Sequence, residues 1–121
     1  MTLPSEQFGD AYCYLVTTGR STGKPREIEI WFGTVDGRTL YLLAGGGENA
    51  HWVRNLRKQP AVTVRVAGVI YPATARVVAS SSDEDGLARK LLVEKYQSGQ
   101  SSDLTTWGRT ALPVALDLDA E

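Results

Sequence analysis

The stretch Thr17–Arg26 carries the densest set of potential ligand-binding side chains in the sequence. Within it lie three cations, four hydroxyls and two glycines: Thr17, Thr18, Gly19, Arg20, Ser21, Thr22, Gly23, Lys24 and Arg26. Guanidinium, ammonium and hydroxyl donors on a glycine-containing loop are the groups that bind phosphate or carboxylate. Surface loops have a similar composition, so this stretch alone leaves anion binding and an ordinary loop as equal alternatives. It is not a Walker loop, because the G-x-x-x-x-G-K-[ST] order is missing.

Side chains that could perform catalysis or hold a metal are few. His51 is the only histidine and Cys13 the only cysteine, which excludes a multi-histidine metal site and zinc held by several thiolates. The sequence therefore predicts no metal site. The position of His51 in the sequence favours a residue in the first turn of a helix over a catalytic base. Glu27 and Glu29 share one face of a strand, where solvent-exposed carboxylates are favoured over an acid pair.

Composition bounds the class of protein. The 121 residues carry a net charge of −1 and are 42% hydrophobic, which predicts one globular domain over residues 1–121. The charge gives no reason to expect nucleic acid as a partner. A single cysteine fits a reducing compartment, and the sequence has no apolar run of membrane-spanning length and no signal-peptide pattern. We therefore expect a cytoplasmic protein without a membrane span.

The hydrophobic pattern predicts a mainly β fold. Residues alternate strictly in Glu27–Phe32, with Ile28, Ile30 and Phe32 on the buried face. The Asp36-Gly37 pair predicts a hairpin in which this strand pairs antiparallel with Thr39–Ala44. We expect a small antiparallel barrel of six strands with two inserted helices. Pro72 predicts an edge or bulge within its strand. The other predicted elements are a polar lead-in at Met1–Asp10, strands Ala11–Thr18, Val62–Val66, Val69–Val78 and Leu112–Leu118, helices Ala50–Gln59 and Asp83–Gln97, and a loop at Ser98–Ser102.

Two motifs carry a resemblance to a known family. Thr17–Arg26 resembles the T-T-G-R-x-[ST]-G-x-P-R signature of the deazaflavin (coenzyme F420)-dependent nitroreductases, and Trp52–Pro60 resembles their W-x-x-N-L-x-x-x-P helix. That family belongs to the split β-barrel superfamily, together with the pyridoxamine-phosphate-oxidase-like flavin proteins that bind FMN. The resemblance runs from about Tyr12 to Leu118, including Gly45–Gly47 and Trp107–Pro113.

The resemblance implies a six-stranded antiparallel split β-barrel and an F420H2-dependent oxidoreductase that transfers a hydride to a small organic acceptor, with FMN as the alternative cofactor. The basic loop would hold the phosphodiester and glutamate tail, and the strand, glycine loop and helix start would line the deazaflavin. The implied cofactor-binding residues are Thr18, Arg20, Ser21, Thr22, Lys24, Pro25, Arg26, Ile28, Ile30, Trp31, Leu43, Ala44, Gly45, His51, Trp52, Val53, Arg54 and Asn55.

The chain also departs from the family pattern. The tyrosines that shape the acceptor pocket are mostly absent, and Tyr96 is the nearest remnant. We expect Glu29 and Tyr96 to be the catalytic residues: Glu29, if it is buried beside Trp31, would act as a proton donor, and Tyr96 would contact an acceptor together with Trp31 and Trp107. The family's N-terminal amphipathic extension is missing, so membrane association is not implied. The acceptor and a homodimer are left open, and a non-catalytic carrier or storage protein for F420, FMN or haem is the alternative function.

Overall fold

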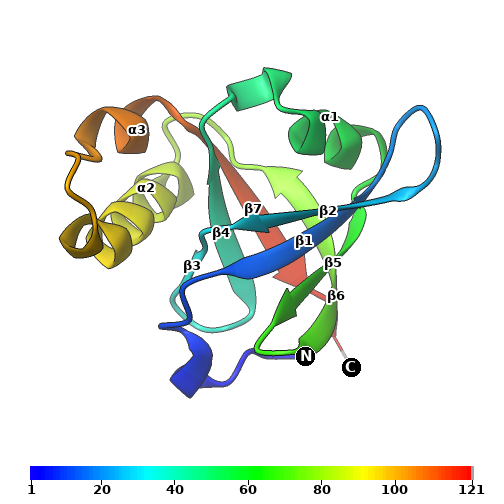
Figure 1. Cartoon of the computed structure of the whole chain (residues 1–121), viewed down its shortest axis with the longest axis horizontal. Helices are drawn as coiled ribbons and strands as arrows, with labels where there is room; N and C mark the ends of the chain where they lie inside the picture. The colour runs from blue at the N-terminus through cyan, green and yellow to red at the C-terminus, as the bar shows by residue number, and fades with distance from the viewer. Residues whose placement is uncertain (121) are drawn as a thin grey trace.

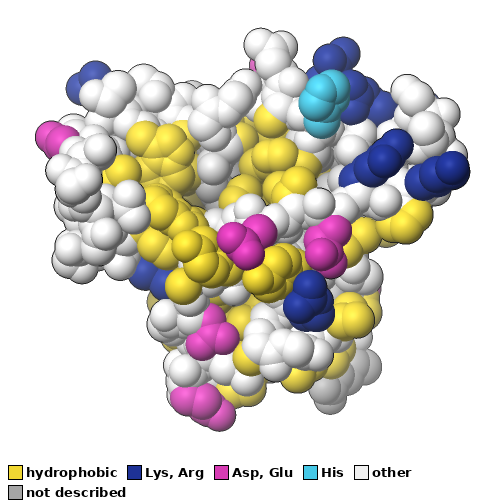
Figure 2. Space-filling view, viewed as in Figure 1, with side chains coloured by type: hydrophobic (Ala, Val, Ile, Leu, Met, Phe, Trp, Pro, Cys, Tyr) yellow, Lys and Arg dark blue, Asp and Glu magenta, His cyan; other side chains and the backbone are white. Residues whose placement is uncertain are grey.

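The structure is a computed structural model that describes residues 1–120. In this part of the chain, strands form one curled antiparallel sheet in the order β2-β1-β5-β6-β7-β4-β3 (Figure 1). Helices α2 and α3 lie on one side of the barrel and α1 on the other, and the space-filling view shows a hollow between them (Figure 2). The strands are β1 Cys13–Thr18, β2 Pro25–Ile30, β3 Gly33–Thr34, β4 Thr39–Ala44, β5 Ala61–Val66, β6 Val69–Val77 and β7 Leu112–Leu118; the helices are α1 His51–Lys58, α2 Asp83–Tyr96 and α3 Thr105–Thr110, with 3-10 turns η1 Ser5–Gln7, η2 Gly47–Asn49 and η3 Gln97–Gly99.

The predicted antiparallel barrel is confirmed, but one predicted strand pairing is wrong. The run Glu27–Phe32 does not pair with β4: β2 pairs with β1, placing Ile28 opposite Leu15, and β4 forms its hairpin with the short strand β3. The chain leaves β2 after Ile30, so β2 and β3 lie at opposite ends of the sheet order. This division adds a strand to the six predicted and creates the split of the barrel. The Asp36-Gly37 turn is confirmed within the β3–β4 hairpin, with Gly37 at φ 75°.

Pro72 marks neither a sheet edge nor a bulge, contrary to the prediction, because the register with β5 runs through it without a break. Strand β6 lies between β5 and β7, and Pro72 sits opposite Thr63 in the ladder with β5. The pairing of β6 with β7 begins one residue later, at Ala73 and Leu118. The proline is tolerated because its missing N–H falls at the end of that ladder, where its carbonyl accepts a hydrogen bond from Asp119 N at 2.9 Å.

The N-terminal segment is part of the core, although its composition predicted a polar lead-in. Leu3 is 1% exposed and packs in the main hydrophobic cluster inside the barrel, with Phe8 against it. Its N–H donates to the Gly37 carbonyl at 2.8 Å. A Cβ at position 37 would lie 2.4 Å from Leu3 O, so this close approach requires the glycine. Residues before β1 therefore close one end of the barrel.

A second cluster fixes α2 and α3 against the outer face of β4 and β7. It is built from Tyr41, Leu43, Ala88, Leu92, Ala111 and Ala115, among others. Helix α3 was not predicted. Gly108 allows it to pack on α2, because a Cβ there would lie 2.3 Å from Val93 Cγ2. Arg89 holds its C-terminal end by donating to the carbonyls of Gly108, Arg109 and Ala111 at 2.8–3.0 Å.

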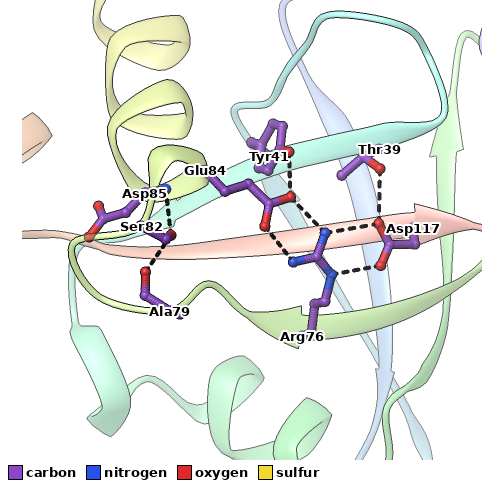
Figure 3. A network of polar contacts seen from close by, with 8 residues as sticks. All are labelled: Thr39, Tyr41, Arg76, Ala79, Ser82, Glu84, Asp85 and Asp117. Atoms are coloured by element: carbon purple, nitrogen blue, oxygen red, sulfur yellow. Dashed lines mark hydrogen bonds and ion pairs between the residues drawn. The ribbon is translucent and has the colours of Figure 1, made fainter.

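A polar network fastens the start of α2 to the sheet (Figure 3). Ser82 caps the helix by accepting a hydrogen bond from Asp85 N at 3.1 Å. Glu84 accepts from Tyr41 Oη at 2.6 Å and from both terminal nitrogens of Arg76, which also binds Asp117. The Arg76 guanidinium and the Tyr41 hydroxyl lower the pKa of Glu84 to about 2. The network therefore joins β4, β6 and β7 to the helix that carries Tyr96.

Candidate functional site

A cleft of about 530 Å³ lies between the β1–β2 loop, strand β2 and helix α1. Lys and Arg side chains gather beside the histidine at one end of this face, and hydrophobic side chains line the hollow next to them (Figure 2). The cleft brings together many of the predicted cofactor-binding residues, namely Arg20, Ser21, Thr22, Arg26, Ile28, His51, Trp52 and Asn55, and adds Thr17, Gly19 and Glu27.

The basic loop is attached to α1 through a buried asparagine. Asn55 is 4% exposed, and its Oδ1 accepts hydrogen bonds from Arg20 N at 3.2 Å and from Arg20 Nη1 at 2.8 Å. Its Nδ2 donates to Thr17 Oγ1 at 3.2 Å. Lys58 Nζ adds a hydrogen bond to the Arg20 carbonyl at 2.8 Å. The loop is therefore held by α1 without a ligand, and Asn55 is the residue of the helix that hydrogen-bonds to it.

The three cations of the loop differ in whether their side chains bind other residues of the protein. The Arg20 guanidinium lies against the start of α1, 3.1 Å from His51 Nδ1 and 3.4 Å from the His51 carbonyl. The exposed side chains of Lys24 and Arg26, in contrast, make no hydrogen bond or ion pair with any residue in the range 1–120. Charged donors of this kind are free to bind an anion. Arg20 is thus mainly a part of the scaffold, and Lys24 and Arg26 supply the uncommitted charge.

The edge of β2 that faces away from β1 presents unpaired backbone groups. Gly19 N donates to Lys24 O at 2.8 Å, which marks that pair as hydrogen-bonded, and the register continues through Thr18 opposite Pro25. Because hydrogen-bonded pairs alternate in an antiparallel ladder, the N–H and C=O groups of Glu27 and Glu29 point to the other edge. Strand β2 ends the sheet order, so no strand within residues 1–120 covers that edge. A flat ligand in the cleft would find donors and acceptors in alternation there.

Three aromatic rings form a cluster on the α2 and α3 side of the hollow. Trp31 stacks on Tyr96 with centroids 4.2 Å apart and planes 3° from parallel. Trp107 meets Trp31 edge to face at 5.6 Å. A Cβ at Gly45 would lie 3.7 Å from Trp107 Nε1, so the glycine loop touches the same cluster. These are the three aromatic residues expected from the sequence to contact the acceptor, and in the structure they lie against one another.

The two predicted catalytic side chains are both engaged elsewhere. Glu29 is exposed and accepts a hydrogen bond from Tyr14 Oη at 2.8 Å, rather than being buried beside Trp31. That carboxylate raises the pKa of Tyr14. The Tyr96 hydroxyl accepts from Phe32 N at 3.0 Å and lies 2.8 Å from the Ala11 carbonyl, and burial raises its pKa to about 12. Neither group is free to donate a proton to a bound acceptor in this arrangement.

The remaining predicted cofactor-binding residues lie outside the cleft. Val53, Leu43 and Ala44 are buried, at 0%, 4% and 1% exposure, so their side chains belong to the core. Ile30 packs against the main cluster, Trp31 belongs to the aromatic cluster, and Gly45 lies against Trp107 of that cluster. Thr18 ends β1, Lys24 lies in the β1–β2 loop, Pro25 begins β2 and Arg54 belongs to α1, but none of the four lines the cleft. Glu27 was favoured as a simple solvent-exposed carboxylate, and its place on an uncovered strand edge could be found only from the sheet order.

The family model for F420H(2)-dependent quinone reductase matches residues 5–119. The chain belongs to this family. The resemblance found in the loop and helix motifs is thereby confirmed at the level of F420-dependent reductases.

Solved structures support the fold. The chain is similar to an F420-H2 dependent reductase (FDR-A), with a TM-score of 0.70, 24% identity, and coverage of 89% of this chain and 95% of that one. It also resembles HutZ, a heme storage protein from Vibrio cholerae, with a TM-score of 0.74, 16% identity, and coverage of 100% and 93%. A protein described as a domain-swapped dimer matches with a TM-score of 0.71, 24% identity, and coverage of 89% and 81%. At these identities, the likenesses confirm the split-barrel architecture.

Residues 1–120 contain no cluster of three or more His, Cys, Asp or Glu side chains placed to hold a metal ion. No helix in this range is both long and apolar enough to cross a membrane.

Proposed function

We propose that this protein is an F420H2-dependent oxidoreductase that reduces a small organic acceptor. The observation that carries the proposal is the cleft, in which a basic loop fixed on α1 adjoins an uncovered strand edge and an aromatic residue, Trp52. When bound, reduced F420 supplies a hydride to an acceptor that stacks on it. The protein then has to bind and orient two flat molecules.

The chemistry of the cleft fits the parts of F420. Lys24 and Arg26 carry uncommitted positive charge for the phosphodiester and glutamate tail, and the hydroxyls of Ser21 and Thr22 add donors. The side chains of Ile28 and Trp52 are half-buried and offer apolar surface to a ring. The backbone groups of Glu27 and Glu29 on the β2 edge would pair with the polar edge of the deazaflavin. Arg20 and Asn55 hold the loop in place.

The acceptor would lie at the aromatic cluster, across the hollow from the basic loop. Trp31 and Trp107 meet edge to face with their planes at 85°, and aromatic side chains of this kind favour a flat ring as a neighbour. Because Glu29 and Tyr96 are engaged with Tyr14 and the backbone, we assign the proton that accompanies the hydride to solvent. The acceptor is thus selected by shape and stacking, and no side chain is required as an acid.

Ligand titration tests the cofactor assignment. Purified protein is mixed separately with F420, FMN and haem, and binding is followed by the change in each ligand's absorbance or fluorescence. We expect F420 to bind, and Arg26→Ala to weaken it about tenfold or more, because a charge-assisted contact is worth roughly 1.5–3 kcal/mol. The loss should shrink as salt rises. Arg38→Ala, an exposed arginine on the distant Asp36-Gly37 turn, is the matched control. Binding of FMN or haem but not F420 would refute the assignment.

Turnover distinguishes a reductase from a carrier. Oxidation of F420H2 is measured with a menadione-type quinone and with a nitroimidazole as acceptors. We expect the quinone to be reduced and the nitroimidazole to react slowly, since the tyrosines that shape that pocket in the nitroreductases are mostly absent here. Tight F420 binding with no turnover of either acceptor would favour the storage function.

A further inference from the structure

The peptide of Phe32 lies at the split of the barrel and has no strand partner. Strand β2 ends at Ile30 and β3 begins at Gly33, at the opposite end of the sheet order. Buried backbone groups at such a break need other partners. The last turn of α2 provides them: Tyr96 Oη accepts from Phe32 N at 3.0 Å, and Lys95 Nζ donates to Phe32 O at 2.8 Å.

Lys95 reaches this carbonyl through an aromatic environment. Its Nζ lies 3.7 Å from the centroid of the Phe32 ring and 5.1 Å from that of Tyr96, both within the range of cation–π attraction. The helix can come this close because the next residue is Gly33, where a Cβ would lie 3.2 Å from side-chain atoms of Leu91 and Leu92. One ammonium group therefore contacts both the carbonyl and the ring of Phe32, as well as the ring on which Trp31 stacks.

We propose that Lys95 is a positioning residue for the acceptor: by holding Phe32 and Tyr96 together, it sets the orientation of Trp31 in the aromatic cluster. The inference rests on the proposed function for the identity of the substrate site. It separates the two ligands, because the clamp of Lys95, Phe32 and Tyr96 includes a ring of the aromatic cluster, and within residues 1–120 none of its hydrogen bonds or ring contacts reaches a residue that lines the basic cleft. Loss of the clamp should affect the acceptor and leave F420 binding unchanged.

The charge of Lys95 gives the clamp a pH dependence. Burial lowers the pKa of Lys95 to about 8. The titratable groups facing it are Asp10 in the segment before β1, Cys13 on β1 and Tyr96 on its own helix. Burial raises the pKa of Cys13 and of Tyr96 to about 12, so both stay neutral when Lys95 titrates. As the pH rises through 8, the ammonium is lost, and both ring contacts lose their electrostatic attraction.

The test combines spectroscopy with kinetics on Lys95→Met, Lys95→Arg and the control Lys90→Met, an exposed lysine of the same helix. Near-ultraviolet circular dichroism from about pH 6 to about pH 10 reports the packing of Trp31 on Tyr96. The wild-type signal should change with a midpoint near pH 8. That change should be absent in Lys95→Met and in Lys95→Arg, whose guanidinium stays charged. Lys90→Met should behave as wild type.

Kinetics with F420H2 and a menadione-type quinone at pH 7 supply the second readout. Lys95→Met should raise KM for the quinone about tenfold, the value of one charge-assisted hydrogen bond, with the Kd for F420 unchanged. Lys95→Arg should restore most of the loss. An unchanged pH transition and an unchanged quinone KM in Lys95→Met would overturn the inference, as would equal losses in F420 affinity and quinone KM. If F420 does not bind to the wild type, the proposed function fails, whereas the pH transition still tests the clamp.

Discussion

Replacing Asn55 with alanine should loosen the basic loop and weaken both the fold and cofactor binding. The side chain is 4% exposed and makes three hydrogen bonds, to Arg20 N, Arg20 Nη1 and Thr17 Oγ1. The alanine variant leaves the Thr17 hydroxyl, on a residue 2% exposed, without its donor. Neutral hydrogen bonds contribute roughly 1 kcal/mol each and one to a charged group roughly 1.5–3 kcal/mol. We expect the free energy of unfolding to fall by about 3.5–5 kcal/mol.

The same change should raise the Kd for F420 by about tenfold, because a loop that α1 no longer holds must be ordered at the moment of binding. Urea unfolding and F420 titration measure the two effects. Asn55→Asp keeps the acceptor for Arg20 and should preserve stability better than alanine, yet its negative charge should weaken anion binding. Asn49→Ala removes an exposed asparagine of η2 and serves as the control. Wild-type stability and affinity in Asn55→Ala would show that the loop does not depend on α1.

Three further predictions concern stability. Leu3→Ala should lower the free energy of unfolding by about 2–5 kcal/mol in urea, since a fully buried leucine leaves a cavity; an unchanged midpoint would mean that the N-terminal segment does not close the barrel. Because Glu84 has a lowered pKa of about 2 against an ordinary 4.5, its stabilisation is complete above about pH 4.5 and is lost as the pH falls towards 2. Thermal melts of Glu84→Gln should show lower stability at pH 7, by about 1 kcal/mol, and a flatter acid limb, with exposed Glu94→Gln as the control. Gly86→Ala, inside α2 with open space around it, should stabilise by about 0.5–1 kcal/mol, whereas Gly23→Ala, at φ 71°, should destabilise.

Local patterns predicted the regular elements well. Strands β4 and β7 have the predicted bounds, because the Asp36-Gly37 turn and an apolar run with clear limits define them. Helix α3 was missed because Thr105–Thr110 contains no apolar period, and its packing depends on Arg89 and Gly108. The division between β2 and β3 could not be predicted from the sequence for a similar reason. The alternation runs on through Phe32, and the side chains that break the ladder come from α2.

Prediction of the candidate site from the sequence was limited in the same way. The residue types of the loop predicted its chemistry, and the family motifs predicted which helix would accompany it. The division of labour between Arg20 and Arg26 could not be predicted, because it depends on whether Asn55, far along the chain, reaches the loop. Glu29 was predicted to be a proton donor if it is buried beside Trp31, which follows it on the same face of the alternating run. Strand β2 ends at Ile30, and Glu29 is exposed, with its carboxylate bound by Tyr14 on β1.

The uncovered edge of β2 has a consequence for how the protein behaves without its ligand. A strand edge with free N–H and C=O groups is a template on which another chain can add a strand, and proteins usually guard such edges with charge or proline. Here Pro25 begins the strand and Glu27 and Glu29 stand on its solvent-facing side. A ligand lying along that edge would occupy the template itself. Loading with cofactor would then protect the protein from self-association, and the empty form would be the one that aggregates.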